Sequence, residues 1–260
     1  MAGFRGRADG LVDFRMVPYP ALTVFIDFGD TLLIDDDGGE RRRGSVVVGL
    51  APCHFRGCGR DVDVLQIRLS PVIAHAVLGV RCGTAVALED LWGSDARRIQ
   101  EQLHAAGSWD DRFAIAQATV ARRFAAGRAV DPEVALAWGQ MVRSRGRVRV
   151  EQLAAEVGWS RKRLWSRFGT QIGLTPKRAA TLVRFDHAAH RLAAGHGVAE
   201  VATDCGFVDQ SHLHRDVMAF TGITPTAVAR APWLAVDDVA WPTTKQAHRR
   251  SGTFLQDTRR

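Results

Sequence analysis

The sequence predicts an α+β N-terminal domain, a small β-sheet with helices packed on one side, followed by an all-α domain of two helix-turn-helix units joined by a long connector helix. Three observations predict this order. Strand-like runs occur early in the chain, the basic charge gathers late, and one helical pattern occurs twice in the second half. We therefore expect three regions, at residues 1–135, 136–230 and 231–260.

The first region reads as strands and then helices. β-branched and aromatic runs, separated by turn clusters, predict strands at 21–28, 31–34, 45–49 and 63–69. The arginines at 41–43 lie among acidic residues and predict a mixed-charge loop. From Pro71 onward a helical period begins, with capping residues such as Ser94 and Asp131, and predicts helices at 71–79, 95–106, 109–128 and 131–144.

The remainder reads as short helices alone. Alternating arginines at 143, 145, 147 and 149 predict an extended basic lead-in. Helices are expected at 150–157, 161–171, 176–194, 198–205, 210–220 and 226–230. The last thirty residues show no sustained period, so we expect a poorly ordered, flexible C-terminal tail.

Charge is unevenly distributed along the chain. Residues 1–135 carry a net charge of −2, residues 136–230 carry +7 from 14 basic and 7 acidic side chains, and residues 231–260 carry +2. A basic segment of this size favours a polyanionic partner, most often nucleic acid, although a solvated basic surface would give the same count.

Two stretches, 153–176 and 201–225, are copies of one pattern. Each has an apolar residue followed by alanine, a glycine-aromatic turn, a helix with a central leucine, and an ending of Gly, Leu or Ile, Thr and Pro. The first helix of each copy presents a small alanine that lets the second helix cross closely, and Gly158 or Gly206 supplies the positive φ that turns the chain. The second helices bury Leu164 and Phe168, or Leu213 and Val217, which leaves a polar and basic face outward.

A connector helix is expected between the copies, over 176–194. At 1.5 Å per residue it spans roughly 29 Å, close to the ~34 Å between successive major-groove faces on one side of duplex DNA. This length fits two reading helices that enter adjacent major grooves.

Residues 145–230 resemble the double helix-turn-helix DNA-binding domain of AraC/XylS-type transcriptional regulators. The second copy, CGFVDQSHLHRDVMAFTGITP at 205–225, is similar to that family's signature. By resemblance, the residues that read bases are Lys162, Trp165, Ser166, Ser211, His212 and Arg215. By the same resemblance, phosphates are bound by Arg161, Arg163, Arg167, Lys177, Arg178 and Gln210.

The resemblance also implies partners. Double-stranded DNA is the expected partner, RNA polymerase is a candidate, and a homodimer is a family-level expectation. Residues 17–29, 65–79 and 86–93 resemble the N-terminal domain of a group of actinobacterial regulators of this type, which implies dimerisation or the sensing of an unknown small-molecule effector. Two departures matter: Ser166 stands where the family often has arginine, and Val217 follows Asp216 where an aromatic and a basic residue are usual. Base preference therefore cannot be copied from relatives, and we expect the second unit to bind more weakly.

Alternative functions involve the cysteines. Cys53, His54 and Cys58 could bind a soft metal, but the sequence offers no fourth ligand. Cys53 or Cys82 could instead accept an alkyl group from damaged DNA, although the four-cysteine zinc pattern of such proteins is absent. No catalytic motif occurs, so no enzymatic activity, cofactor or metal is expected.

Other side chains allow two interpretations. His187 and His190 could form half a metal site or a phosphate-facing surface. Trp165 could pack against the connector or contact a thymine methyl group. No apolar run approaches the roughly 18 residues of a membrane span, and the N-terminus lacks a secretory signal, so we expect a cytoplasmic protein that does not enter a membrane.

Overall fold

The computed structural model describes residues 1–28, 33–35, 41–50, 55–79, 85–230, 234–235 and 255–257. Its strands are β1 (Ala2–Met16), β2 (Leu22–Asp27), β3 (Leu33–Asp35), β4 (Arg41–Arg43), β5 (Val46–Val48), β6 (Phe55–Leu69), β7 (Val86–Ala87), β8 (Leu234–Ala235) and β9 (Leu255–Asp257). Its helices are α1 (Pro71–Leu78), α2 (Leu88–Trp92), α3 (Ser94–Ala105), α4 (Trp109–Ala126), α5 (Pro132–Arg143), α6 (Val150–Glu156), α7 (Arg161–Ile172), α8 (Pro176–Ala193), α9 (Val198–Asp204), α10 (Gln210–Thr221) and α11 (Pro225–Val228). The predicted fold class, a small sheet with helices and then a helical region, is confirmed.

The sheet is organised around the long strand β6. One edge of β6 pairs antiparallel with β1, from Ala2 opposite Gln66 to Met16 opposite Phe55. The other edge pairs with β2 and β3, and the order continues through β5 to β7 on one side and to β4 on the other. All six residues of β2 are buried, which agrees with its nearly continuous apolar sequence.

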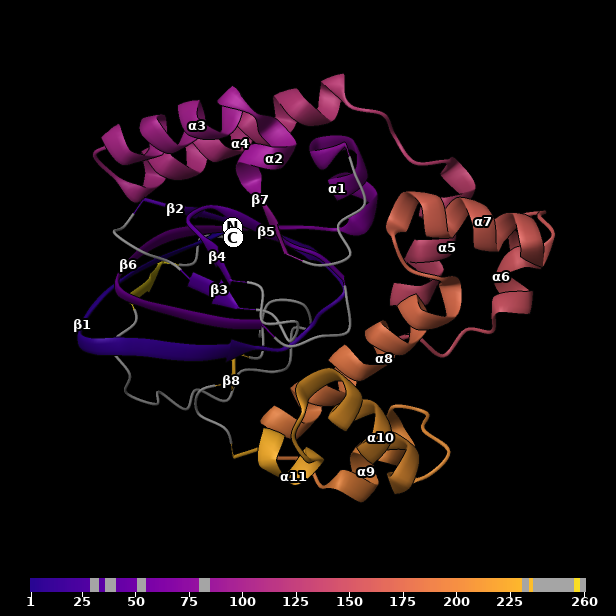
Figure 1. The fold of residues 1–260 in the computed structure, drawn as a ribbon. Coiled ribbons are helices and arrows are strands. Elements are labelled where there is room, and N and C mark those ends of the chain that lie inside the picture. The colour runs from indigo at the N-terminus through magenta and orange to yellow at the C-terminus, as the bar shows by residue number, and fades with distance from the viewer. Residues whose placement is uncertain are drawn as a thin grey trace.

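Helices α2, α3 and α4 cover one side of the sheet (Figure 1). Arg112 of α4 fixes this layer from a buried position. Its guanidinium lies 4.5 Å from the ring centroid of Phe28, forms an ion pair with Asp63 of β6 at 3.2 Å, and donates from Nε to the carbonyl of Leu103 at 3.0 Å. Because its charge is paired with Asp63 and its Nε–H is bonded to a carbonyl, the desolvation penalty of burying this arginine is offset.

Helices α5 to α11 form the second part of the molecule, with α8 running between two helical groups (Figure 1). Helix α5 packs against α6, α7 and α8, and α1 contacts both α5 and α7. Buried apolar side chains form one continuous cluster from the sheet through α1 into these helices. No helix in the described part of the chain is long and apolar enough to cross a membrane.

Several local expectations were wrong. Residues 2–16 form a strand that the sequence reading did not predict, and the arginines at 41–43 form β4, paired with β3, where a loop was expected. The lead-in to the second half begins with a turn where an extended segment was expected, since Arg145 and Gly146 both have positive φ values, of 54° and 73°, and it is extended at Arg149. Most of the predicted flexible tail lies outside the described residues, and the two described segments in it, β8 and β9, pair with β1.

Candidate nucleic-acid interface

The first helix-turn-helix unit consists of α6, a glycine turn and α7. Leu153 and Ala154 of α6 are buried as predicted, and Gly158 turns the chain with a φ of +66°. Ser160 caps the start of α7, because its side-chain oxygen accepts a hydrogen bond from the backbone N–H of Arg163 at 3.2 Å. This cap satisfies one of the free N–H groups at the start of the helix.

Helix α7 has a buried face and an outward face. Leu164 and Phe168 are fully buried. Since residues of an α-helix are about 100° apart around its axis, Lys162 and Ser166 lie on the opposite side, and both are exposed. Trp165 lies on one flank with 47% of its surface exposed, so an aromatic ring is available there for contact with a ligand.

The second unit repeats this construction with α9 and α10. Val201 and Ala202 of α9 are buried, and Gly206 makes the turn with a φ of +74°. Asp209 caps α10 by accepting a hydrogen bond from the backbone N–H of His212 at 2.7 Å. The twofold pattern in the sequence therefore corresponds to two units of the same local structure.

The outward face of α10 is centred on Ser211 and Arg215. Leu213 and Val217 are fully buried on the other side of the helix. Ser211 and Arg215 are exposed, and Nε of Arg215 donates to the backbone carbonyl of Ser211 at 3.4 Å. These two side chains are therefore available to a groove of nucleic acid.

His212 is placed differently from the other candidate base readers. It is partly buried, its ring meets that of Phe207 edge-on at 5.4 Å between centroids, and its Nε2 lies 3.8 Å from a carboxylate oxygen of Asp216. Asp216 also forms an ion pair with Arg184 of α8 at 3.3 Å. His212 is thus held on the flank of α10, beside the connector.

The connector α8 is one unbroken helix of 18 residues. Its first residue is Pro176, and the preceding Thr175 caps it, because the Thr175 side-chain oxygen accepts a hydrogen bond from the backbone N–H of Arg178. Its length is about 27 Å at 1.5 Å per residue. Phe185 in the middle of α8 is fully buried and stacks on Phe220 of α10 at 4.4 Å between centroids, which fixes the second unit against the connector.

Two predicted phosphate contacts on α7 lie on the surface near its start. Arg161 is exposed and forms an ion pair with Glu151 of α6 at 3.1 Å. The guanidinium of Arg163 lies over the ring of Trp159 at 4.4 Å. Ion pairs between exposed side chains contribute little to stability, so the pair with Glu151 leaves Arg161 able to exchange its partner.

The other phosphate candidates outside α7 are also exposed. Lys177 and Arg178 lie in the first turn of α8, and Gln210 opens α10. Lys177 and Arg178 also line a groove of about 370 Å³ between α8, α10 and Leu50 of the N-terminal part. These two cations therefore lie where the two parts of the molecule meet.

Arg167 departs from this pattern. Its guanidinium makes two hydrogen bonds to the carboxylate of Asp131, at 2.7 and 2.8 Å. These bonds hold the pKa of Asp131 at about 2, below its usual value, and a side-chain hydrogen bond with Gln171 acts in the same direction. The sequence predicts Asp131 only as a helix-capping residue, because nothing in the local pattern connects it to Arg167, which lies 36 positions later.

A second buried pair lies under the second unit. Nδ1 of His187 is 3.0 Å from Sγ of Cys205. Burial lowers the pKa of His187 to about 4 and raises the pKa of Cys205 to about 11, so both groups are neutral at ordinary pH. His190 turns instead to the backbone carbonyl of Asp186, with 2.7 Å between Nδ1 and the oxygen.

No group of three or more histidine, cysteine, aspartate or glutamate residues that could hold a metal occurs within the residues that the structure describes. Cys53, His54 and Cys82, which carry the metal and alkyl-transfer alternatives, lie outside the described residues, as does the side chain of Cys58. These two alternatives stay sequence-based hypotheses.

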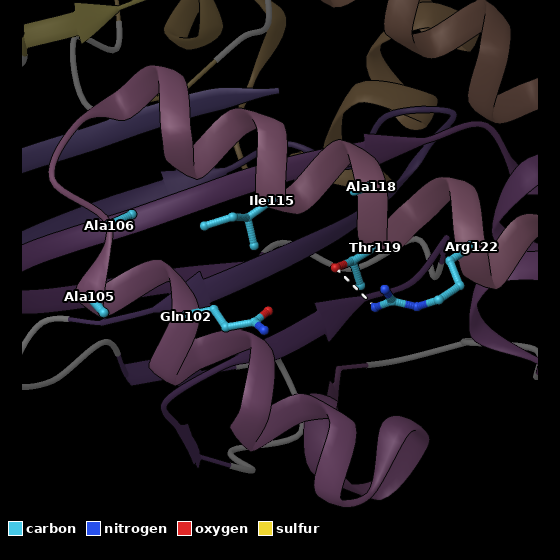
Figure 2. Close-up of a pocket in the computed structure, with 7 residues that line it drawn as sticks. All are labelled: Gln102, Ala105, Ala106, Ile115, Ala118, Thr119 and Arg122. Carbon is cyan, nitrogen blue, oxygen red and sulfur yellow. Dashed lines mark hydrogen bonds between the residues drawn. The ribbon is translucent and has the colours of Figure 1, made fainter.

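A shallow groove of about 440 Å³ lies on the N-terminal part, between α3 and α4 (Figure 2). Alanines and Ile115 form much of its wall, and Arg122 donates to the hydroxyl of Thr119 at 3.4 Å. Gln102 completes its polar lining. The residues that line it include no acid–base pair and no nucleophile with an activating partner.

Comparisons with known proteins agree with this arrangement. Residues 153–231 match a family model described as a helix-turn-helix domain, and this range contains both copies of the repeat. No curated protein matches the chain. Among solved structures, ToxT from Vibrio cholerae O395 is 11% identical with a TM-score of 0.50, over 88% of this chain and 96% of that chain.

Two further similar structures each cover less than half of this chain. The C-terminal domain of AraT, a response regulator from Geobacillus stearothermophilus, is 19% identical with a TM-score of 0.38, over 46% of this chain and 96% of that chain. A transcriptional regulator described by its AraC-type DNA-binding domain, from Chromobacterium violaceum, is 23% identical with a TM-score of 0.36, over 39% and 94%. Residues 153–231 of this chain are therefore a helix-turn-helix domain.

Proposed function

We propose that this chain is a sequence-specific DNA-binding transcription regulator whose helices α7 and α10 enter adjacent major grooves. The observation that carries the proposal is the pair of exposed reading faces at the two ends of one continuous helix. The connector is about 27 Å long, and the segments that join its ends to α7 and α10 add to the separation of these two helices. This separation suits the ~34 Å between successive major-groove faces on one side of the duplex.

The proposed contact residues fall into two sets, one that reads bases and one that binds phosphates. Sequence is read by Lys162, Trp165 and Ser166 of α7 and by Ser211, His212 and Arg215 of α10. Phosphates are bound by Arg161, Arg163, Lys177, Arg178 and Gln210. Most of the affinity would come from the phosphate contacts, because their release of counterions is favourable, and binding would weaken steeply as salt rises.

In vitro selection of bound duplexes, followed by titration of the selected site, tests the proposal. Lys162→Ala combined with Arg215→Ala removes one base contact from each helix and should weaken binding at least about thirtyfold, since each contact contributes about 1–3 kcal/mol. Arg97→Ala combined with Arg98→Ala is the matched control, because both are exposed cations of α3 and their loss changes the net charge by the same amount. Equal affinity of the reading-helix variant and the control for the selected duplex would contradict the proposed reading helices.

We also propose a division of labour between the regions 1–135, 136–230 and 231–260. The boundary predicted at 135/136 would cut α5, which packs against α6, α7 and α8, so we propose to move the start of the DNA-binding unit back to the start of α5, near residue 131. The segment before it is proposed as a sensor or dimerisation domain. Sedimentation of the full chain with and without duplex would show whether one or two copies bind a site. The selected sites would show the same, because one copy should select one pair of short sequence boxes, one for each reading helix, and two copies should select two pairs.

The effector-responsive role rests on the contact between α1 and α7. A ligand that shifts α1 would alter the first reading helix, because packed helices transmit displacement. Screening small molecules for a raised unfolding temperature of the full chain, then measuring DNA affinity with each hit, tests this role. Hits that stabilise the protein and leave DNA affinity unchanged would argue against it.

A further inference from the structure

Arg167 and Asp131 form a rigid link between the first reading helix and the segment that follows α4. Both oxygens of the Asp131 carboxylate accept hydrogen bonds from the guanidinium, from Nε at 2.7 Å and from Nη2 at 2.8 Å. This two-point contact uses the planar fork of arginine and fixes direction as well as distance. A lysine at the same place could offer only a point charge.

The link lies away from the outward face of α7. At about 100° per residue, Arg167 is about 160° around the helix from Trp165 and about 40° from the buried Gln171. Lys162 and Ser166 are at the centre of the exposed arc. Arg167 is therefore at the edge of the buried face, and its charge is already neutralised by Asp131.

A third hydrogen bond, made by Gln171, strengthens the link. Oε1 of Gln171, a side chain that is 9% exposed, accepts from the backbone N–H of Asp131 at 2.8 Å. Arg167 and Gln171 are four residues apart on α7, so Asp131 is held at two successive turns of the same edge. Two contacts along one edge prevent the helix from rotating about its axis.

The segment that carries Asp131 is itself fixed to the N-terminal part. Val130 is 7% exposed and belongs to the hydrophobic core. At Gly127, an added Cβ would lie 2.0 Å from the carbonyl oxygen of Ala76 in α1, so the chain passes directly over α1 there. Asp131 is therefore a fixed point against which α7 can be oriented.

We propose that Arg167 is a positioning residue and not a phosphate contact: with Asp131 it sets the rotation of α7 about its axis, so that Lys162 and Ser166 face the major groove. This inference rests on the proposed function, because it assigns a task within the same DNA interface. It separates Arg167 from Arg163, which lies four residues earlier on α7 and is exposed without a carboxylate partner among the described residues.

The test compares four single variants of the full chain on the selected duplex over a range of salt concentrations. Arg167→Gln removes the charge, Arg167→Lys keeps the charge but cannot form the fork, and Asp131→Asn removes the partner while keeping its shape and its N–H to Gln171. Arg163→Gln is the control for a phosphate contact. Each variant is also measured on duplexes with one base pair changed, either in the box read by α7 or in the box read by α10.

If the link positions α7, both Arg167 variants and Asp131→Asn weaken binding to the selected site by a similar factor, about tenfold, through misplaced base contacts. The loss of discrimination is confined to the box read by α7, and the slope of log affinity against log salt stays as in the wild type. Arg163→Gln lowers that slope by about 0.9, the value for one phosphate contact. A role in stability alone would lower the active fraction equally for every duplex and leave discrimination unchanged.

Three results would overturn the inference. One is wild-type behaviour of Arg167→Lys together with a slope lowered by about 0.9 in Arg167→Gln, which is the signature of a phosphate contact. Another is unchanged binding by Asp131→Asn, and a third is an equal loss of discrimination in both boxes. Failure of the wild-type chain to bind any duplex would overturn the proposed function as well, and it is distinguished from the other results because the wild type itself is then inactive.

Discussion

Replacing Gly146 with alanine is expected to destabilise the helical part of the molecule far more than the same change at Gly158. Gly146 has a φ of +73° and lies against the middle of α8. An added Cβ would be 2.2 Å from the carbonyl oxygen of Ala180 and 2.7 Å from the backbone nitrogen of Arg184. These atoms belong to the connector backbone and cannot turn aside as a side chain could.

The magnitude follows from two separate costs. Alanine in the left-handed region costs about 1–2 kcal/mol, partly offset by about 0.4–1 kcal/mol from its smaller unfolded-state entropy. Displacing packed backbone adds about 1–3 kcal/mol. At Gly158, with φ +66° and no atom within 4 Å of the added Cβ, the backbone cost acts alone. We expect about 2–4 kcal/mol for Gly146→Ala and about 1 kcal/mol for Gly158→Ala.

Equilibrium unfolding in urea, followed by far-ultraviolet circular dichroism and tryptophan fluorescence, measures both changes. The comparison is valid where the two variants share the same dependence of free energy on denaturant, since only then does a shift in midpoint report stability. Agreement of the two free energies within about 0.5 kcal/mol would refute the reasoning, because it would mean that α8 moves away from residue 146 at negligible cost.

Three further predictions concern buried groups and helix caps. The pKa of His187 is about 4 in the folded protein, below its ordinary value of 6.5, so as the pH falls the unfolded chain binds a proton before the folded chain does. The free energy of unfolding should therefore decrease as the pH drops from 6.5 towards 4. His187→Gln should remove this part of the pH dependence of the urea midpoint. The pKa of Cys205 is raised to about 11 from 9.0, so the thiol ionises first in the unfolded chain, and the free energy of unfolding should decrease as the pH rises from 9 towards 11. Peptide mass spectrometry after iodoacetamide treatment at pH 8 should find Cys205 unmodified until denaturant is added. Rapid labelling of the native protein would contradict the burial of this thiol. Ser160→Ala and Asp209→Ala each remove the side-chain cap of a reading helix and should each cost about 1 kcal/mol in the same urea assay, whereas no change in either would show that the caps are dispensable.

The helices of the second half could be predicted from sequence because their signals are local. Thr175 and Pro176 mark the start of α8 within two residues, and the first is a side-chain cap in the structure. Leucines at the centres of α7 and α10 repeat at matching positions and are fully buried. The exposure of both reading faces follows from the same period, since a helix with one buried face must present the other to solvent.

The strand β1 could not be predicted in this way. It mixes glycines and charged residues, and its partner β6 pairs with it from Ala2 opposite Gln66, more than sixty positions away. Strand pairing of this kind is decided by contacts between distant segments, so local composition carries little of the signal. Strand β4 was missed for the same reason, because Arg41–Arg43 has no apolar alternation and is defined by its pairing with β3.

Within the interface, the sequence did not predict the pairings between residues that are distant along the chain. Asp131 and Arg167 are 36 positions apart, and His187 and Cys205 are 18 apart. Each residue alone has an ordinary local interpretation, as a cap, a surface cation or a core side chain. Only the crossing of α5, α7, α8 and α9 brings them together, and that crossing is a property of the packed structure.

The two reading helices are held in different ways, and this asymmetry bears on how the N-terminal part can influence DNA binding. Helix α10 is anchored by the connector itself: Arg184 of α8 forms an ion pair with Asp216 and lies 4.7 Å from the ring centroid of Phe207. Helix α7 is anchored by Asp131, outside the repeat and next to α1. A displacement of the segment that carries Asp131 therefore acts directly on α7. Helix α10 is held by α8 instead, and it adjoins the N-terminal part at the groove that Leu50 lines. Any signal carried by the Asp131 segment should change how the first box is read before it changes the second.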